Sequence, residues 1–179
     1  MTASAVIALG SSLGPSRALL RLAVAMLAAS PGILAVDPSR IYLTPPDGGV
    51  ARRPFLNAAV RVHTTLDPIA LHARTRAIEA RLGRRPTRRW ADRRIDLDLL
   101  VYDDRVLTTP DLVLPHPRMH NRAFQLLPLL DCWPDVPGRW RELAADMPPL
   151  PIVGVLPRHP ARVRHTVPLP GAPQSAILP

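Results

Sequence analysis

Acidic and apolar side chains alternate along one short segment, and this alternation fixes both the local structure and its place in a fold. Asp96 and Asp98 alternate with Ile95, Leu97 and Leu99. A β-strand directs successive side chains to opposite faces, so the aspartates share one face and the apolar residues share the other. The segment is therefore predicted to be a strand with one face in a hydrophobic core and the other at a polar site.

The two aspartates follow an arginine-rich segment, residues 84–94. Carboxylates two residues apart on one strand face lie about 6–7 Å from each other, and their repulsion costs on the order of 2.5 kcal/mol at an effective dielectric constant of about 20. Magnesium would remove this cost, because it prefers one or two carboxylates together with water and phosphate oxygens. The pattern indicates a magnesium–nucleotide site in which arginines bind the remaining phosphate oxygens. Solvated strand-face charges, paired with Arg93 or Arg94, are the alternative interpretation.

Strands and helices are predicted to alternate along the chain in the order strand, helix, strand, strand, helix, strand. This order is typical of the split βαβ pattern, an α+β fold with helices over an antiparallel sheet. The clearest helix has Asp67 as a candidate N-cap, Pro68 in its first turn and Gly83 as its stop. The predicted strands are residues 5–9, 33–43, 55–65 and 95–103, and the predicted helices are residues 18–29, 66–83, 121–132 and 139–147.

The composition bounds the chemistry and the location of the protein. All 23 basic residues are arginine and the net charge is +9, so lysine-dependent phosphate binding and Schiff-base chemistry are excluded. Cys132 is the single cysteine, which favours a buried structural thiol and a reducing, cytoplasmic setting. The N-terminus lacks the pattern of a secretory signal, and the longest apolar segment, residues 18–29, is too short to cross a membrane.

Several short motifs occur in one order along the chain. They are ALGSSLG at 8–14, YLTPP at 42–46, FLNAAV at 55–60, IEARLGR at 78–84, RWADRRIDLDLLVYDD at 89–104 and LPHPRMHNRAFQLLPL at 114–129. Together they closely resemble the hydroxymethyl-dihydropterin pyrophosphokinase family, HPPK, of folate biosynthesis. Residues 1–147 are therefore expected to form an HPPK-like catalytic domain. Residues 148–179 are rich in proline and are expected to be a tail that wraps the surface or is disordered.

The resemblance implies a fold, a reaction and a set of ligands. The implied fold is a ferredoxin-like three-layer α/β/α sandwich with a mainly antiparallel sheet. The implied reaction is transfer of pyrophosphate from ATP to the hydroxymethyl group of 6-hydroxymethyl-7,8-dihydropterin, which leaves AMP. Two Mg²⁺ ions would be held by Asp96 and Asp98. The expected partners are these small molecules alone, with no nucleic acid and no membrane, and the expected assembly is a monomer.

The resemblance also assigns site residues. The catalytic group would comprise Asp96, Asp98, Arg89 and Arg93. The pterin would bind between two aromatic rings in a pocket formed by Thr44, Pro45, Pro46, Phe55, Asn57 and Phe124. ATP would contact Glu79, Arg89, Trp90, Arg93, His116 and Arg122.

Some of these assignments have structural alternatives. Core packing is the simpler interpretation of a phenylalanine without its motif. Glu79 could bind a ribose or lie on a helix surface, and His116 could donate to a phosphate or make a structural hydrogen bond. Trp90 could shield the nucleotide or anchor a mobile loop, and residues 84–94 are expected to close over the site as a lid.

The chain departs from the family pattern at two substituted segments, in a basic loop that is one residue shorter than in some relatives, and in a short loop after TPP. GSSLG contains a serine where the family usually has asparagine. Ala91 and Asp92 stand where many relatives have Gly-Pro before the arginine, and Asp92 brings a negative charge near the expected phosphates. These departures affect the geometry of the predicted lid more than the reaction.

Two other classes of function compete with the enzyme. The net charge of +9 and the fold would suit an arginine-rich nucleic-acid-binding module, but seven aromatic residues are few for base stacking. A catalytically inactive HPPK relative is the second alternative, and the intact aspartate pair argues against it.

Overall fold

The computed structural model describes residues 2–46, 50–86 and 91–157. Its main sheet has the strand order β5-β1-β4-β3-β8, with β2 also paired to β4, and each of these pairings is antiparallel. The sheet strands are β1 (Ala3–Ser11), β2 (Ile33–Pro38), β3 (Arg40–Thr44), β4 (Phe55–Thr64), β5 (Asp96–Tyr102) and β8 (Ile152–Val155), and a hairpin is formed by β6 (Leu107–Thr108) and β7 (Val113–Leu114). The helices are α1 (Ser16–Ala28), α2 (Pro68–Arg81), the 3₁₀ turn η1 (Met119–Asn121), α3 (Ala123–Cys132) and α4 (Gly138–Ala145).

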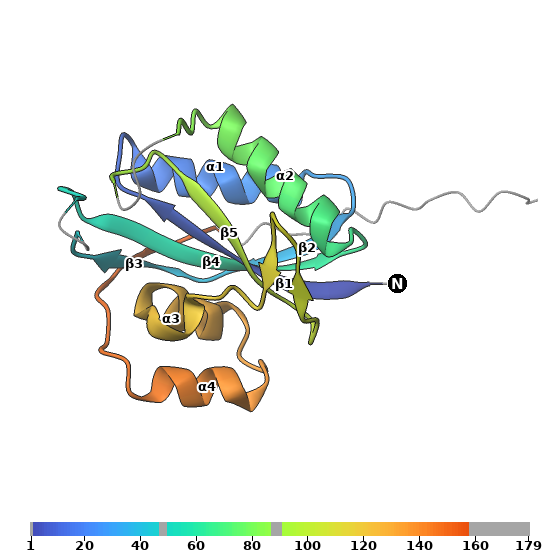
Figure 1. Ribbon diagram of the computed structural model, residues 1–179. Coiled ribbons are helices and arrows are strands. Elements are labelled where there is room, and N and C mark those ends of the chain that lie inside the picture. The colour runs from blue at the N-terminus through green and yellow to red at the C-terminus, as the bar shows by residue number, and fades with distance from the viewer. Residues whose placement is uncertain (1, 47–49, 87–90, 158–179) are drawn as a thin grey trace, which may run out of the picture.

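Helices cover both faces of the sheet (Figure 1). Helices α1 and α2 lie on one face, where Leu20 and Ile78 pack with Ile7, Leu97 and Leu99. Helix α3 lies on the other face and α4 packs outside it, and their buried side chains form a second core with residues from β1, β4 and β5. The predicted three-layer α/β/α sandwich with a mainly antiparallel sheet is confirmed.

Local sequence explains the limits of α2. The Asp67 carboxylate accepts a hydrogen bond of 2.8 Å from the backbone N–H of Ala70, and Pro68 occupies the first turn. Gly83 follows the helix with φ +83°, a left-handed conformation that glycine adopts without strain. The predicted N-cap and stop are both confirmed.

The predicted strand 33–43 is interrupted in the structure. Ser39 separates β2 from β3, and both segments pair with β4. The Ser39 hydroxyl accepts from the N–H of Ala59 at 2.8 Å and donates to the carbonyl of Arg40 at 2.7 Å. A side chain thus replaces one backbone partner of the ladder, which lets the chain change register without leaving a buried N–H unpaired.

The sheet continues past the expected domain boundary at residue 147. Strand β8 pairs with β3, and Leu156 is buried in the core that α1 and α2 cover. The Arg17 guanidinium donates to the Val153 carbonyl at 2.6 Å, and the absence of a side chain at Gly154 leaves room for it. The first part of the proline-rich segment is therefore an edge strand, while residues 158–179 lie outside the described part of the chain.

In the described segments no helix combines the length and the apolar character needed to cross a membrane.

Candidate active site

Strand register brings the polar residues of the site side by side on the sheet face that α3 covers. Gly10 of β1 lies between Asn57 of β4 and Asp96 of β5, and Ala8 lies beside Asp98. A Cβ atom at Gly10 would lie 3.3 Å from Asn57 Oδ1 and 4.0 Å from Asp96 Cβ. Two small residues thus keep the floor of the site open between the amide and the carboxylates.

A cavity of about 510 Å³ lies over this floor. Its walls come from the sheet, the start of α3, the residues around β3 and β4, and the arginine-rich segment. The lining residues are Ala8, Leu9, Gly10, Thr44, Pro45, Pro46, Phe55, Asn57, Arg84, Ala91, Arg93, Asp96, Asp98, His116, Arg118, Arg122, Ala123, Phe124, Gln125 and Leu150.

One part of the cavity is aromatic and contains an oriented amide. Phe55 begins β4 and Phe124 lies in the first turn of α3, so the two rings come from different layers and line the same cavity. Asn57 is buried, and its Nδ2 donates to Thr44 Oγ1 at 2.8 Å, which fixes the amide orientation. The cavity also includes Pro45 and Pro46, so the structure brings together all six residues of the predicted pterin pocket.

The other part of the cavity contains acids and arginines. Arg84 Nη1 lies 2.5 Å from Asp96 Oδ1, and Arg93 Nη1 donates to Asp96 Oδ2. Asp96 is therefore held between two guanidinium groups. Arg122 also lines the cavity, with its guanidinium carbon 5.4 Å from the centre of the Phe124 ring.

The electrostatics distinguish the two aspartates. Burial, followed by repulsion from Asp96, raises the pKa of Asp98 to about 6, although Arg84, Arg122 and Arg93 oppose the shift. The ionised form of Asp98 is therefore costly. Two such acids on one cavity wall supply the hard oxygen ligands that divalent cations bind.

His116 is held as a neutral ring. Burial, together with Arg122 and Arg118, lowers the pKa of His116 to about 4. Its Nδ1 accepts a hydrogen bond of 3.3 Å from the backbone N–H of Arg118, and its own backbone N–H donates to Leu100 O at 2.8 Å. This pairing leaves the proton on Nε2, which can then donate to a ligand.

Glu79 does not line the cavity, in contrast to its expected contact with ATP. Its side chain is 2% exposed, and Oε1 accepts from the N–H of Leu97 at 2.7 Å and from Arg84. Burial raises the pKa of Glu79, against the opposing effects of Leu97 and Arg84. These contacts make Glu79 a support for β5 and for Arg84, and its contact with ATP stays a prediction.

Two other predicted contacts, Arg89 and Trp90, lie outside the described residues. The structure adds cavity residues that the motifs had not assigned, including Arg84, Arg118 and Gln125. The sequence does not distinguish Arg84 from the other arginines of residues 84–94, because its contacts with Glu79 and Asp96 depend on the fold. Gln125 is buried, and its Oε1 has no hydrogen-bond partner within the described parts of the chain.

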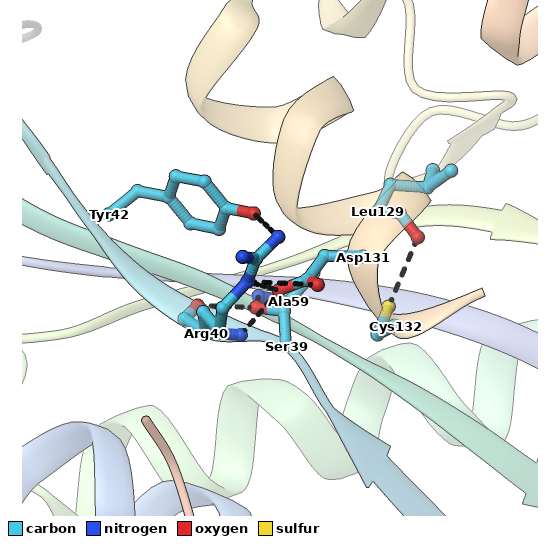
Figure 2. A network of polar contacts seen from close by, with 7 residues as sticks. All are labelled: Ser39, Arg40, Tyr42, Ala59, Leu129, Asp131 and Cys132. Atoms are coloured by element: carbon cyan, nitrogen blue, oxygen red, sulfur yellow. Dashed lines mark hydrogen bonds and ion pairs between the residues drawn. The ribbon is translucent and has the colours of Figure 1, made fainter. Parts of the chain in front are cut away.

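Helix α3 is anchored to β3 near its C-terminal end, where Asp131 meets Arg40 (Figure 2). The Asp131 carboxylate accepts from the Arg40 backbone N–H at 2.6 Å and from Arg40 Nε at 3.1 Å. Cys132 is buried beside it, and burial raises the pKa of its thiol. The interpretation of Cys132 as a structural residue is therefore supported by its surroundings.

The described residues contain no cluster of three or more histidine, cysteine or acidic side chains that could hold a metal ion. A cation at Asp96 and Asp98 would complete its coordination with water and with oxygens of a ligand. This is the usual arrangement for magnesium, which keeps several waters and binds together with substrate phosphates.

The cavity combines two aromatic rings with paired acids and several arginines, on a three-layer fold. This combination is expected of an enzyme that binds a flat heterocycle and a phosphorylated ligand. The family model for 7,8-dihydro-6-hydroxymethylpterin-pyrophosphokinase (HPPK) matches residues 6–134. The chain belongs to the HPPK family.

Curated relatives agree with this membership. The 2-amino-4-hydroxy-6-hydroxymethyldihydropteridine pyrophosphokinase of Methylorubrum extorquens is 46% identical over 132 residues, which are 74% of this chain and 84% of that protein. The enzyme of the same name from Bacillus subtilis is 42% identical over 127 residues, 71% of this chain and 76% of that protein.

A solved structure supports the fold. The crystal structure of Plasmodium falciparum HPPK-DHPS with pteroate matches with a TM-score of 0.61 at 17% sequence identity. The match covers 81% of this chain but 42% of that longer chain. At this identity the likeness shows the shared fold alone.

Proposed function

We propose that this chain transfers pyrophosphate from ATP to the hydroxymethyl group of 6-hydroxymethyl-7,8-dihydropterin in a magnesium-dependent reaction that releases AMP. The observation that carries the proposal is one cavity in which an aromatic, amide-bearing part adjoins a part with two carboxylates and several arginines. The names of the curated relatives support the same reaction.

Asp96 and Asp98 would hold the divalent ions. The donor set fits, because both carboxylates line the cavity and the raised pKa of Asp98 reflects a site where negative charge is costly. When bound, magnesium would neutralise negative charge that develops during transfer.

The aromatic part of the cavity would bind the pterin. Phe55 and Phe124 offer two faces for stacking a flat ring, and such contacts contribute roughly 0.5–1.5 kcal/mol each beyond burial. Asn57, oriented by Thr44, presents its amide to the mixed donor and acceptor edge of the heterocycle. This orientation would direct the hydroxymethyl group toward the carboxylates.

Arginines would bind the phosphates and stabilise the transferring group. Arg84 and Arg93 pair with Asp96, so a nucleotide and its cation would replace both partners together. The guanidinium groups would then bind phosphate oxygens with charge-assisted hydrogen bonds. Neutral His116 would donate from Nε2 to the same anion, because its Nδ1 already accepts from the backbone.

The arrangement favours this enzyme over a nucleic-acid-binding module. Arginines converge on a cavity that also contains two acids, and the acids would repel a nucleic-acid backbone in the absence of metal. The intact acidic pair likewise disfavours an inactive relative. Monomeric assembly and a cytoplasmic location remain predictions.

The direct test is AMP formation from ATP and Mg²⁺, measured with and without 6-hydroxymethyl-7,8-dihydropterin. We expect AMP only when pterin and Mg²⁺ are both present. Asp98→Ala should lower kcat by roughly 10²–10³-fold while pterin still binds. Asp104→Ala is the matched control, since the Asp104 side chain is 81% exposed and lies outside the cavity lining. Pterin-independent or absent AMP formation by the wild type would contradict the proposal.

A further inference from the structure

One carboxylate joins three separate segments around the cavity. Asp92 accepts from Ser12 Oγ at 3.1 Å, from the backbone N–H of Arg52 at 3.2 Å and from the backbone N–H of Arg53 at 3.3 Å. Ser12 belongs to the turn after β1, and Arg52 and Arg53 belong to the connection between β3 and β4. We call the contacts among Ser12, Arg52, Arg53 and Asp92 the Asp92 junction.

Backbone hydrogen bonds fix Asp92 to the turn after β1. The N–H groups of Ser12 and Leu13 donate to the Arg93 carbonyl at 2.9 and 3.0 Å, and the Arg93 N–H donates to Ser12 Oγ at 3.0 Å. Ser11 Oγ donates to the Arg94 carbonyl at 2.6 Å. The segment that leads into β5 is therefore firmly held, and the Asp92 carboxylate extends this support to residues 52–53.

Both sides of the junction lead directly to the cavity. On one side, Ala91 and Arg93 flank Asp92 and line the cavity, whereas Asp92 does not. On the other side, the connection that contains residues 52–53 leads into Phe55, which lines the aromatic part. The Asp92 carboxylate therefore connects the two segments from outside the cavity lining.

We propose that Asp92 is a positioning residue that couples the pterin and nucleotide parts of the cavity by holding residues 52–53 against the segment of Arg93. A ligand that orders one side of the junction would reduce the ordering cost for a ligand on the other side, which is positive coupling between the two sites. This inference rests on the proposed function, because it takes pterin and ATP as the two ligands.

The experiment measures the dissociation constant of 6-hydroxymethylpterin by calorimetry, with and without Mg²⁺ and a non-hydrolysable ATP analogue. The ratio of the two constants is the coupling factor. For the wild type we expect a factor of about 10 or more, within the usual range for coupled sites. Asp92→Ala should bring it close to 1, and Asp92→Asn, which keeps one acceptor oxygen, should give an intermediate factor. Asp104→Ala should match the wild type.

Hydrogen exchange of the Arg52 and Arg53 amides provides a second readout that needs no ligand. Both amides should exchange faster in Asp92→Ala than in Asp104→Ala, because their acceptor has been removed. An Asp92→Ala protein that keeps the wild-type coupling factor, or a wild type with a factor of 1, would overturn the role of Asp92. A wild type that binds neither ligand would instead remove the proposed function itself.

Discussion

The two aspartates of the site differ although they share a strand face. Asp96 is paired with Arg84 and Arg93, whereas burial and the neighbouring Asp96 make the charge on Asp98 costly. Ionised Asp98 is therefore an unfavourable group in the folded protein. Such destabilising groups are common at functional sites, where a ligand relieves the cost.

Replacement of Asp98 should separate stability from activity. The pKa of Asp98 in the folded protein, about 6, exceeds its ordinary value of 3.8, so the fold loses stability as the pH rises from about 3.8 to about 6, and the full cost remains at higher pH. Asp98→Asn should raise the free energy of unfolding at pH 8 by about 1–3 kcal/mol in the absence of metal. The gain should disappear below pH 4, where the carboxyl is protonated in both states. Denaturant unfolding at several pH values measures this, and a less stable variant at pH 8 would contradict it.

Divalent-ion affinity should depend on pH through the same residue. Protonation of Asp98 removes a ligand charge, so affinity for Mg²⁺ in the presence of an ATP analogue should fall as pH drops below about 6. His116 should not contribute, because its pKa of about 4 keeps it neutral through this range. Titrations between pH 5 and 8 test this dependence. An affinity that stays constant across the range would show that Asp98 is ionised throughout or does not bind the ion.

Gly10 should control access to the floor of the cavity. In Gly10→Ala the new methyl group would lie 3.3 Å from Asn57 Oδ1, in the space between the amide and Asp96. We expect pterin affinity to fall about 10-fold, a cost of about 1.4 kcal/mol. Gly138→Ala is the matched control, since a Cβ atom there has no neighbour within 4 Å. Fluorescence titration with pterin measures both variants, and equal affinities would show that the floor tolerates the methyl group.

Site residues that belong to one short motif could be predicted from the sequence. The alternation around Asp96 and the position of Asn57 within FLNAAV were sufficient to predict residues that the structure brings to one cavity. The contacts of Glu79 with Leu97 and Arg84 could not be predicted, because helix periodicity does not reveal which residues of other elements meet its carboxylate. The sequence shows that Asp92 carries a negative charge near the expected site. Its contacts could not be predicted, because its partners lie 39 to 80 residues away in the chain.

At the scale of elements, the sequence predicted the order of helices and strands but missed two features of β3. The interruption at Ser39 depends on a side-chain hydrogen bond to another strand. The pairing of β3 with β8 depends on a proline-rich segment that lacks strand periodicity. Both features concern long-range contacts, which local propensity does not determine.

Truncation should show that β8 belongs to the catalytic unit. A chain that ends after residue 147 would lose the β3–β8 pairing, the buried Leu156 side chain and the Leu150 part of the cavity wall. We expect its free energy of unfolding to fall by about 3 kcal/mol, mainly from lost apolar burial, and pterin affinity to weaken. A chain that ends after residue 157 is the control and should resemble the full chain. Equal stability of the two truncated chains, measured by denaturant unfolding, would contradict this role.

In the whole molecule, one face of the sheet forms hydrophobic core, and the other face also carries the candidate site. The face under α1 and α2 is filled with apolar side chains from β1, β4 and β5. The opposite face combines a second core with a cavity, because α3 covers it beside small and polar residues. The net charge of +9 would also favour the approach of a negatively charged nucleotide.

The most direct test is a crystal structure with Mn²⁺ in place of Mg²⁺, a non-hydrolysable ATP analogue and 6-hydroxymethylpterin. Anomalous scattering would locate the ions. We expect metal ions bound to both Asp96 and Asp98, with the Arg84 and Arg93 side chains moved from Asp96 onto phosphate oxygens. Nucleotide and pterin bound elsewhere, with Asp96 still paired to both arginines and no ion at either carboxylate, would contradict it.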